Sequence, residues 1–231
     1  MGHAIAASML GDGNRVTIVG RNAARLDAAR EQLETDGPGT AARLDTVVAD
    51  IADESAVERL FAGTGPVDHV VITAVDATGA YQPVSTLDLT AARRLIDTKI
   101  LGAALVAKHA APTMPSAGSI TFTSGIAAYR PAPGGSMVAA VNGALESLAA
   151  ALAVELAPLR VNVVSPGWVD TPVWDAIAGD GKAARLGAMA DRLPAGRIGA
   201  PEDIAQAFTA LMANGFITGT VLHVDGGHRF V

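Results

Sequence analysis

The stretch Arg160-Val161-Asn162-Val163-Val164-Ser165-Pro166-Gly167 decides the fold, because it has the pattern of a buried strand that ends in a Pro-Gly turn. Its three valines favour extended backbone, and they do not alternate strictly with polar residues. A strand that is apolar toward both faces is typical of a parallel sheet with helices on each side. The rest of the chain should therefore supply more strands of this kind and the helices that cover them.

Short apolar runs do recur on both sides of this stretch, and they alternate with longer Ala-rich helical patterns. The expected strands are 15–19, 44–48, 67–72, 119–123, 161–164 and 221–224. The expected helices are about 2–10, 23–34, 54–62, 89–111, 137–156 and 201–213. Such alternation predicts parallel βαβ units. We therefore expect an α/β fold, a doubly wound parallel sheet in a three-layer α/β/α arrangement, formed by one domain over residues 1–231.

The composition excludes several classes of function. The chain has no Cys, which rules out a disulfide framework, a thiol nucleophile and a zinc–thiolate centre, and we expect no metal site. A net charge of −6 without a basic cluster argues against nucleic acid. We find neither a run of about 18 apolar residues nor a basic segment ahead of an apolar start. The sequence thus predicts a cytoplasmic protein that binds a small molecule and no membrane.

Several segments, in order and at matching separations, resemble the short-chain dehydrogenase/reductase family over nearly the whole chain. The most specific are 160–167 and the ending Gly199-Ala200-Pro201-Glu202-Asp203-Ile204, which is followed by Thr218-Gly219 and Val224-Asp225-Gly226-Gly227. The resemblance implies a Rossmann-type fold and an oxidoreductase that moves hydride between NADP(H) and a small carbonyl or alcohol. It also implies a homotetramer or homodimer, to which Leu101 and Leu105 are candidate contacts.

The start of the chain carries the cofactor signals. Met1-Gly2-His3-Ala4-Ile5-Ala6 resembles the end of the family's T-G-x-x-x-G-x-G turn, which places Gly2 near the pyrophosphate. Arg21 and Asn22 then stand where relatives that prefer NAD carry an Asp. An Arg at this place favours a 2′-phosphate and hence NADP(H). The alternative is that Arg21 is a solvated surface residue.

Further cofactor contacts are implied by the resemblance alone. Asp50 and Ile51 match the pair that contacts adenine, and Ala74 is the one residue kept from the N-N-A-G pattern in 72–75. The loop that holds the nicotinamide carboxamide corresponds to Pro166, Gly167, Val169 and Thr171. These residues complete the expected cofactor site.

The usual catalytic pair of the family is absent. Aligning 143–156 places Val138 at the position of the catalytic Tyr and Asn142 at that of the Lys. Val has no titratable group, whereas Asn142 can still hydrogen-bond a ribose hydroxyl. Losing a positioned acid or base typically lowers the rate about 10²–10⁴-fold. Any turnover therefore needs a replacement proton donor.

Lys99 is the candidate for that role. It replaces the family's catalytic Asn, and helix geometry at about 100° per residue centres it on an apolar stripe. Leu95, Gly102, Ala103 and Val106 share this side, whereas Arg94, Asp97 and Lys108 lie opposite. Its ammonium is expected to hold the substrate oxygen or to act as an acid with a lowered pKa. The alternative is a structural Lys whose stem reaches water through the cleft.

Two hydroxyl residues follow the fourth expected strand. Ser124 resembles the family's substrate-orienting Ser, with a local capping role as the alternative. Tyr129 is a second possible acid, although shaping the substrate loop is the better interpretation. Residues 171–197, which cover the site in relatives, hold no diagnostic motif, and Trp168 and Trp174 indicate only an apolar pocket. The competing hypothesis for the whole chain is a pseudoenzyme that binds NADP(H) and acts as a sensor or partner subunit.

The chain opens with a helix where this fold calls for a central strand. We therefore expect the strands at 15–19 and 67–72 to have unpaired edges, and we expect the natural product to start upstream of Met1 with a strand and T-G-x-x-x-G. Buried backbone groups without partners cost about 1–3 kcal/mol each. An upstream strand would relieve that cost.

Overall fold

The computed structural model describes residues 1–37 and 39–231. Its strands are β1 (Val16–Gly20), β2 (Leu44–Val48), β3 (His69–Ile72), β4 (Ser119–Thr123), β5 (Arg160–Pro166) and β6 (Val221–Val224). Its α-helices are α1 (Gly2–Gly11), α2 (Ala23–Asp36), α3 (Glu54–Thr64), α4 (Leu89–Ile96), α5 (Gly102–Ala110), α6 (Ser136–Glu155), α7 (Val173–Ala178), α8 (Lys182–Ala190) and α9 (Pro201–Ala213). Each expected strand is present. Short β-branched runs between helical segments are typical of strands that are buried on both faces of a parallel sheet.

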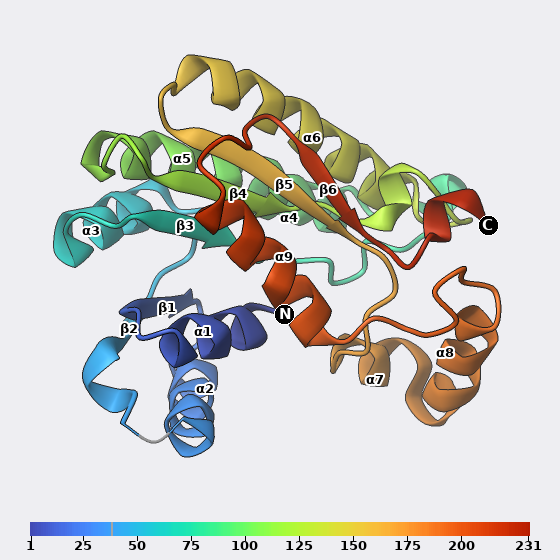
Figure 1. Cartoon of the computed structure of the whole chain (residues 1–231). Helices are drawn as coiled ribbons and strands as arrows, with labels where there is room; N and C mark the ends of the chain where they lie inside the picture. Colours follow the sequence, from blue (N-terminus) through green and yellow to red (C-terminus); the bar gives the residue numbers. More distant parts are fainter. Residues whose placement is uncertain (38) are drawn as a thin grey trace.

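Two expectations about helices were incomplete. The expected helix 89–111 is divided by a π-helical segment, Asp97–Leu101, which separates α4 from α5. The stretch 171–197 contains α7 and α8, which the sequence pattern did not reveal because both are short, with six and nine residues. Both helices lie away from the sheet, beyond the end of α9 (Figure 1).

The strands are parallel and form a sheet in two parts. β1 pairs with β2, and β3, β4, β5 and β6 pair in that order. The register aligns Val16 with Leu44 in the first part, and Ser119 with Arg160 in the second. The stretch 160–167 supplies the central β5, whose residues are all buried. The parallel α/β prediction is confirmed.

Helices cover both faces of the sheet and bury two main apolar clusters. On one face α3, α5 and α6 pack against β3, β4 and β5, with Phe122 and Leu145 among the buried residues. On the other face α1 and α9 pack against β5 and β6 around Phe208. Figure 1 shows the two layers, with α4, α5 and α6 on one side and α1 and α9 on the other. The three-layer expectation therefore holds.

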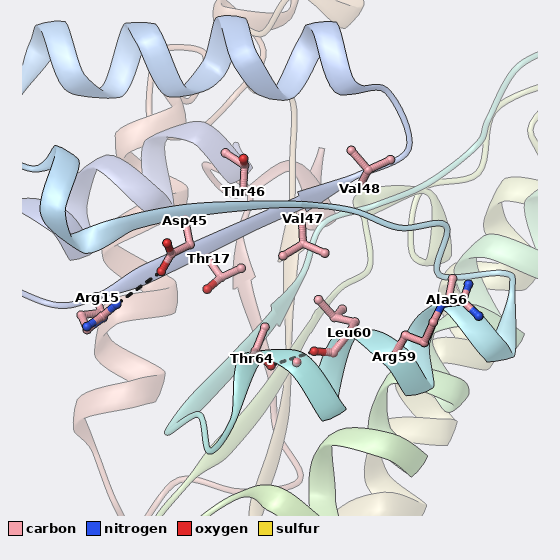
Figure 2. A pocket seen from close by; sticks show the side chains of 11 residues that line it. Arg15, Thr17, Asp45, Thr46, Val47, Val48, Ala56, Arg59, Leu60 and Thr64 are labelled. Carbon is pink, nitrogen blue, oxygen red and sulfur yellow. Dashed lines mark hydrogen bonds and ion pairs between the residues drawn. The ribbon is translucent and has the colours of Figure 1, made fainter.

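The two parts of the sheet meet without pairing. Among the described residues β1 has no partner strand other than β2, and β3 has none other than β4. A groove of about 540 Å³ lies between the β1–β2 pair and α3 (Figure 2). It is lined by Arg15, Thr17, Asp45, Thr46, Val47, Val48, Ala56, Arg59, Leu60, Gly63 and Thr64. The free edges of β1 and β3 agree with the expectation for the strands at 15–19 and 67–72. The strand expected upstream of Met1 stays a prediction.

Candidate active site

Lys99 lies in the π-helical segment Asp97–Leu101, at the point where α4 passes into α5. π-helical turns inside α-helices are rare and occur frequently at functional sites. The next residue of the same face, Gly102, lets this helix approach the loop after β2, because a Cβ there would lie 3.0 Å from Ile51 Cγ1. The start of α5, directly after the Lys99 turn, therefore packs closely against the loop after β2.

The Lys99 side chain is buried, with an exposed fraction of 8%. Its Nζ donates to the backbone carbonyl of Ser124 over 3.5 Å, and no ion pair of the described residues includes it. Burial lowers the pKa of Lys99 from 10.5 to about 8, because the ammonium loses hydration without gaining a carboxylate partner. The expectation that Lys99 faces the apolar interior is confirmed.

Asn142 binds the same turn from the opposite helix. Its Nδ2 donates to the carbonyl of Gly125 over 3.4 Å, next to the Ser124 carbonyl that Lys99 holds. Lys99 and Asn142 are therefore neighbours across one turn, the first from the α4–α5 helix and the second from α6. Val138, one turn earlier on α6, belongs to an apolar cluster with Ala80 and Leu95 and offers no polar group.

The hydroxyl of Ser124 points elsewhere. It donates to Glu146 Oε1 over 2.6 Å, while a Cβ built on Gly125 would lie 3.1 Å from Asn142 Nδ2. The residue that faces Asn142 is thus Gly125. Ser124 contributes only its backbone carbonyl, which accepts from Lys99 Nζ. This arrangement differs from the expected use of Ser124 through its hydroxyl.

Glu146 fixes this turn at two points and was missed by the sequence reasoning. Its other oxygen, Oε2, accepts from the Tyr129 hydroxyl over 2.6 Å. Burial, together with this carboxylate, raises the pKa of Tyr129 to about 12. Tyr129 is therefore a poor acid near neutral pH. The available signal was spacing, since Glu146 lies one helical turn beyond Asn142 on the same face of α6.

The first predicted cofactor residue, Gly2, lies beside the loop after β3. Gly2 opens α1 close to the loop after β3, and a Cβ on it would lie 2.9 Å from Thr73 Oγ1. The first backbone N–H groups of α1 receive no side-chain cap. Free amides and a close backbone approach suit a phosphate. Ala74, in the loop after β3, is exposed beside them.

Arg21, Asn22 and Asp50 gather where β1 and β2 end. Both terminal nitrogens of Arg21 donate to Asp76 Oδ2 over 3.2 Å, and Asp50 Oδ2 lies 3.8 Å from Arg21 Nη1. Asn22 caps α2 by accepting from the Arg25 amide over 3.0 Å. Arg21 is thus an exposed cation in an ion pair, and Asn22 has a local structural role.

The loop after β5 carries the remaining predicted contacts. Pro166 is buried, and Gly167 meets the chain after β6 so closely that a Cβ would lie 2.7 Å from Asp225 Cα. Val169 and Thr171 are also buried. The Val169 carbonyl accepts from the Trp174 indole over 2.9 Å, which ties this loop to α7.

The region predicted to cover the substrate has an aromatic wall. The rings of Trp168 and Trp174 lie 4.5 Å apart, and the Arg185 guanidinium of α8 lies 5.7 Å from each. Lys182 of α8 forms ion pairs with Asp170 of the loop after β5, at 2.9 Å, and with Asp175 of α7, at 3.0 Å. The two indoles agree with the expected apolar pocket, and the cations of α8 add polar groups at its edge.

Because the strands are parallel, their carboxyl ends meet at one edge of the sheet, where ligands bind in folds of this kind. The turns that carry Arg21, Asp50, Ala74, Ser124 and Gly167 all follow such ends. In the described part of the chain no group of three or more His, Cys, Asp or Glu is placed to hold a metal ion.

Comparisons with known proteins agree with the fold and with the family resemblance. The model of the family described as enoyl-(acyl carrier protein) reductase matches residues 1–229. The short-chain dehydrogenase/reductase ATR9 of Stachybotrys chlorohalonatus is 35% identical over 237 residues, which cover 98% of this chain and 92% of that protein.

Two solved structures are similar to the whole chain. MalC reductase/Diels-Alderase from Malbranchea aurantiaca is 34% identical with a TM-score of 0.90, covering 98% of this chain and 91% of that one. A small-chain dehydrogenase in complex with NADPH is 33% identical with a TM-score of 0.79, covering 94% of this chain and 100% of that one.

Proposed function

Because this chain belongs to the short-chain dehydrogenase/reductase family, we propose that it reduces a small carbonyl, or oxidises the corresponding alcohol, with NADP(H) as the hydride carrier. The observation that carries the proposal is the buried Lys99 ammonium beside the Ser124–Gly125 turn, in a chain whose sequence lacks the Tyr and Lys of the family pattern. The NADPH bound to a similar dehydrogenase supports the choice of cofactor.

The cofactor, when bound, supplies or accepts the hydride. The residues that would hold it are Gly2, Arg21, Asp50, Ile51, Ala74, Pro166, Gly167, Val169 and Thr171, with Asn22 supporting the turn of Arg21. The uncapped amides of α1 and the exposed guanidinium of Arg21 fit its phosphates. The loop after β5, in which Val169 and Thr171 are buried, would hold the carboxamide of the nicotinamide.

Lys99 performs the proton step. In the reducing direction its ammonium donates a proton to the oxygen of the carbonyl, and in the oxidising direction the neutral amine accepts it. The Ser124 carbonyl positions Nζ, while Asn142 holds the adjacent Gly125 carbonyl. Ser124, Lys99 and Asn142 thus form the proposed catalytic group, and Glu146 positions the turn through the Ser124 hydroxyl.

The rate should follow the ionisation of Lys99. Since its pKa is about 8, kcat/KM for reduction should be constant at lower pH and fall as the pH rises through that value. For oxidation kcat/KM should rise through the same value. Tyr129, with a pKa of about 12, and His223, whose pKa burial lowers below 6.5, titrate outside this interval. Initial rates over pH in both directions test this, and a flat profile across pH 8 contradicts the role of Lys99.

The competing function is a pseudoenzyme that binds NADP(H) without turnover, which the loss of the Tyr and Lys favours. A panel of aldehydes, ketones and alcohols, followed by the absorbance of the reduced nicotinamide, separates the two. We expect turnover with at least one apolar substrate, because Trp168 and Trp174 pack against each other in the region proposed to cover the substrate. Tight NADPH binding without turnover on the whole panel would favour the pseudoenzyme.

We also propose a homotetramer or homodimer in the cytoplasm. α6 exposes small residues along one face, and neighbouring copies can pack on such a face. That face includes Ala140, Ala144, Ser147, Ala151 and Val154. Leu101 is also exposed, at 53%, whereas Leu105 packs partly against the core.

α6 is long and apolar enough to cross a membrane, but its other face buries Leu145 and Ala149 in the core.

A further inference from the structure

The residue predicted to recognise the 2′-phosphate is already bound to a carboxylate. Arg21 directs Nη1 and Nη2 at one oxygen of Asp76, each over 3.2 Å. Asp50 adds a second carboxylate 3.8 Å from Nη1. These two terminal nitrogens form the fork with which a guanidinium binds a phosphate in bidentate fashion. Asp76 therefore competes with a 2′-phosphate for these two nitrogens.

Asp76 is held more firmly than Arg21. Its amide donates to Thr98 Oγ1 over 3.1 Å, and its Oδ1 accepts from the Thr78 amide over 3.2 Å. The Asp76 side chain is 13% exposed, whereas that of Arg21 is 51% exposed. The Thr78 amide, and then Arg21, lower the pKa of Asp76, so it stays ionised near neutral pH. An arriving phosphate thus meets a fixed negative charge and has to draw Arg21 away from it.

We propose that Asp76 is a specificity-determining residue that opposes the 2′-phosphate and so limits the preference for NADPH over NADH. The proposal rests on the NADP(H) assignment made above. With one cation and two carboxylates, the site carries a net charge of −1 before any phosphate arrives. A phosphate is repelled by Asp76, whereas the ribose 2′-hydroxyl of NADH is uncharged and donates to a carboxylate without repulsion. Asp76 therefore penalises NADPH alone.

The test is Asp76→Asn, which removes the charge but keeps the shape and the acceptor for Thr78. Dissociation constants for NADPH and NADH are measured by fluorescence titration. Removing one charge near the phosphate should tighten NADPH binding about tenfold and change NADH binding less than about twofold. Asp45→Asn, which breaks the exposed Arg15–Asp45 ion pair of the same two strands, is the matched control and should alter neither constant.

Asp76→Asn is also measured in a chain that carries Arg21→Met, which tests whether Asp76 acts through Arg21. Asp76 acts in two ways, by holding Arg21 and by repelling the phosphate directly. The gain from Asp76→Asn should therefore be smaller when Arg21 is absent, and the gain that remains measures the direct repulsion. Asp76→Ser, which also keeps an acceptor oxygen, is measured beside Asp76→Asn, so a folding defect in one variant does not decide the result.

The outcomes separate this proposal from the one on which it rests. If the parent chain binds NADPH, but Asp76→Asn and Asp76→Ser bind it no more tightly, the role of Asp76 is wrong and the cofactor assignment stands. If no version binds NADPH, both proposals fail.

Discussion

We expect turnover to be lost when Lys99 is replaced by Met. The buried ammonium is the proposed proton donor, and Val138 and Asn142 offer no substitute. Removing a positioned acid lowers rates by about 10²–10⁴-fold, so kcat should fall by at least that range. NADPH binding should stay nearly unchanged, because the proposed cofactor contacts lie on other turns. Steady-state kinetics and an NADPH titration on the same preparation measure the two effects.

The matched control for this variant is Lys108→Met. Lys108 lies on α5, where its Nζ makes an exposed ion pair with Glu54, away from the Ser124–Gly125 turn. Its replacement should leave kcat unchanged. Met fills the Lys99 site with an apolar chain of similar length, and the folded state should therefore be at least as stable in thermal unfolding. Full activity of Lys99→Met would mean that Lys99 has a structural role only.

NADPH affinity is the second quantity with a large expected change. Arg21→Met removes the cation and leaves Asp76 and Asp50 beside the place of the 2′-phosphate. A charge-assisted hydrogen bond contributes about 1.5–3 kcal/mol, so the dissociation constant for NADPH should rise about 10–150-fold. That for NADH should change little.

Arg25→Met is the matched control for Arg21, since Arg25 is exposed in the first turn of α2 and forms no ion pair among the described residues. Its replacement should leave both affinities as they are. Equal losses of NADPH and NADH binding in Arg21→Met would contradict a contact with the 2′-phosphate.

The fold could be predicted because its signals are local. Buried β-branched runs such as 160–167 specify strands, and the periodic pattern on 137–156 specifies a long helix with one buried face. The burial of Lys99 also follows from helix geometry. The apolar side of a helix faces the core, and Lys99 lies at the centre of that side. The π-helical turn around Lys99 leaves no such periodic mark, because it depends on how the helix packs against Ile51.

The partners in the site could not be predicted, because they come from contacts between distant turns. Glu146 meets Ser124 and Tyr129 only when α6 lies beside the turn after β4. Asp76 meets Arg21 only when the loops after β1 and β3 converge. The family resemblance placed Ser124 by position along the chain, whereas the structure turns its hydroxyl toward Glu146. Which atom of a residue faces the site is decided by the backbone of the turn.

Isotope transfer from the cofactor tests the central claim most directly. NADPH that carries deuterium at the transferring position of the nicotinamide is incubated with the chain and an aldehyde or ketone, and the alcohol is analysed by mass spectrometry. The account predicts an alcohol with one deuterium on the former carbonyl carbon, formed by the parent chain and by Lys108→Met but not by Lys99→Met. Bound NADPH with no labelled product, across carbonyl substrates of different size, would contradict it.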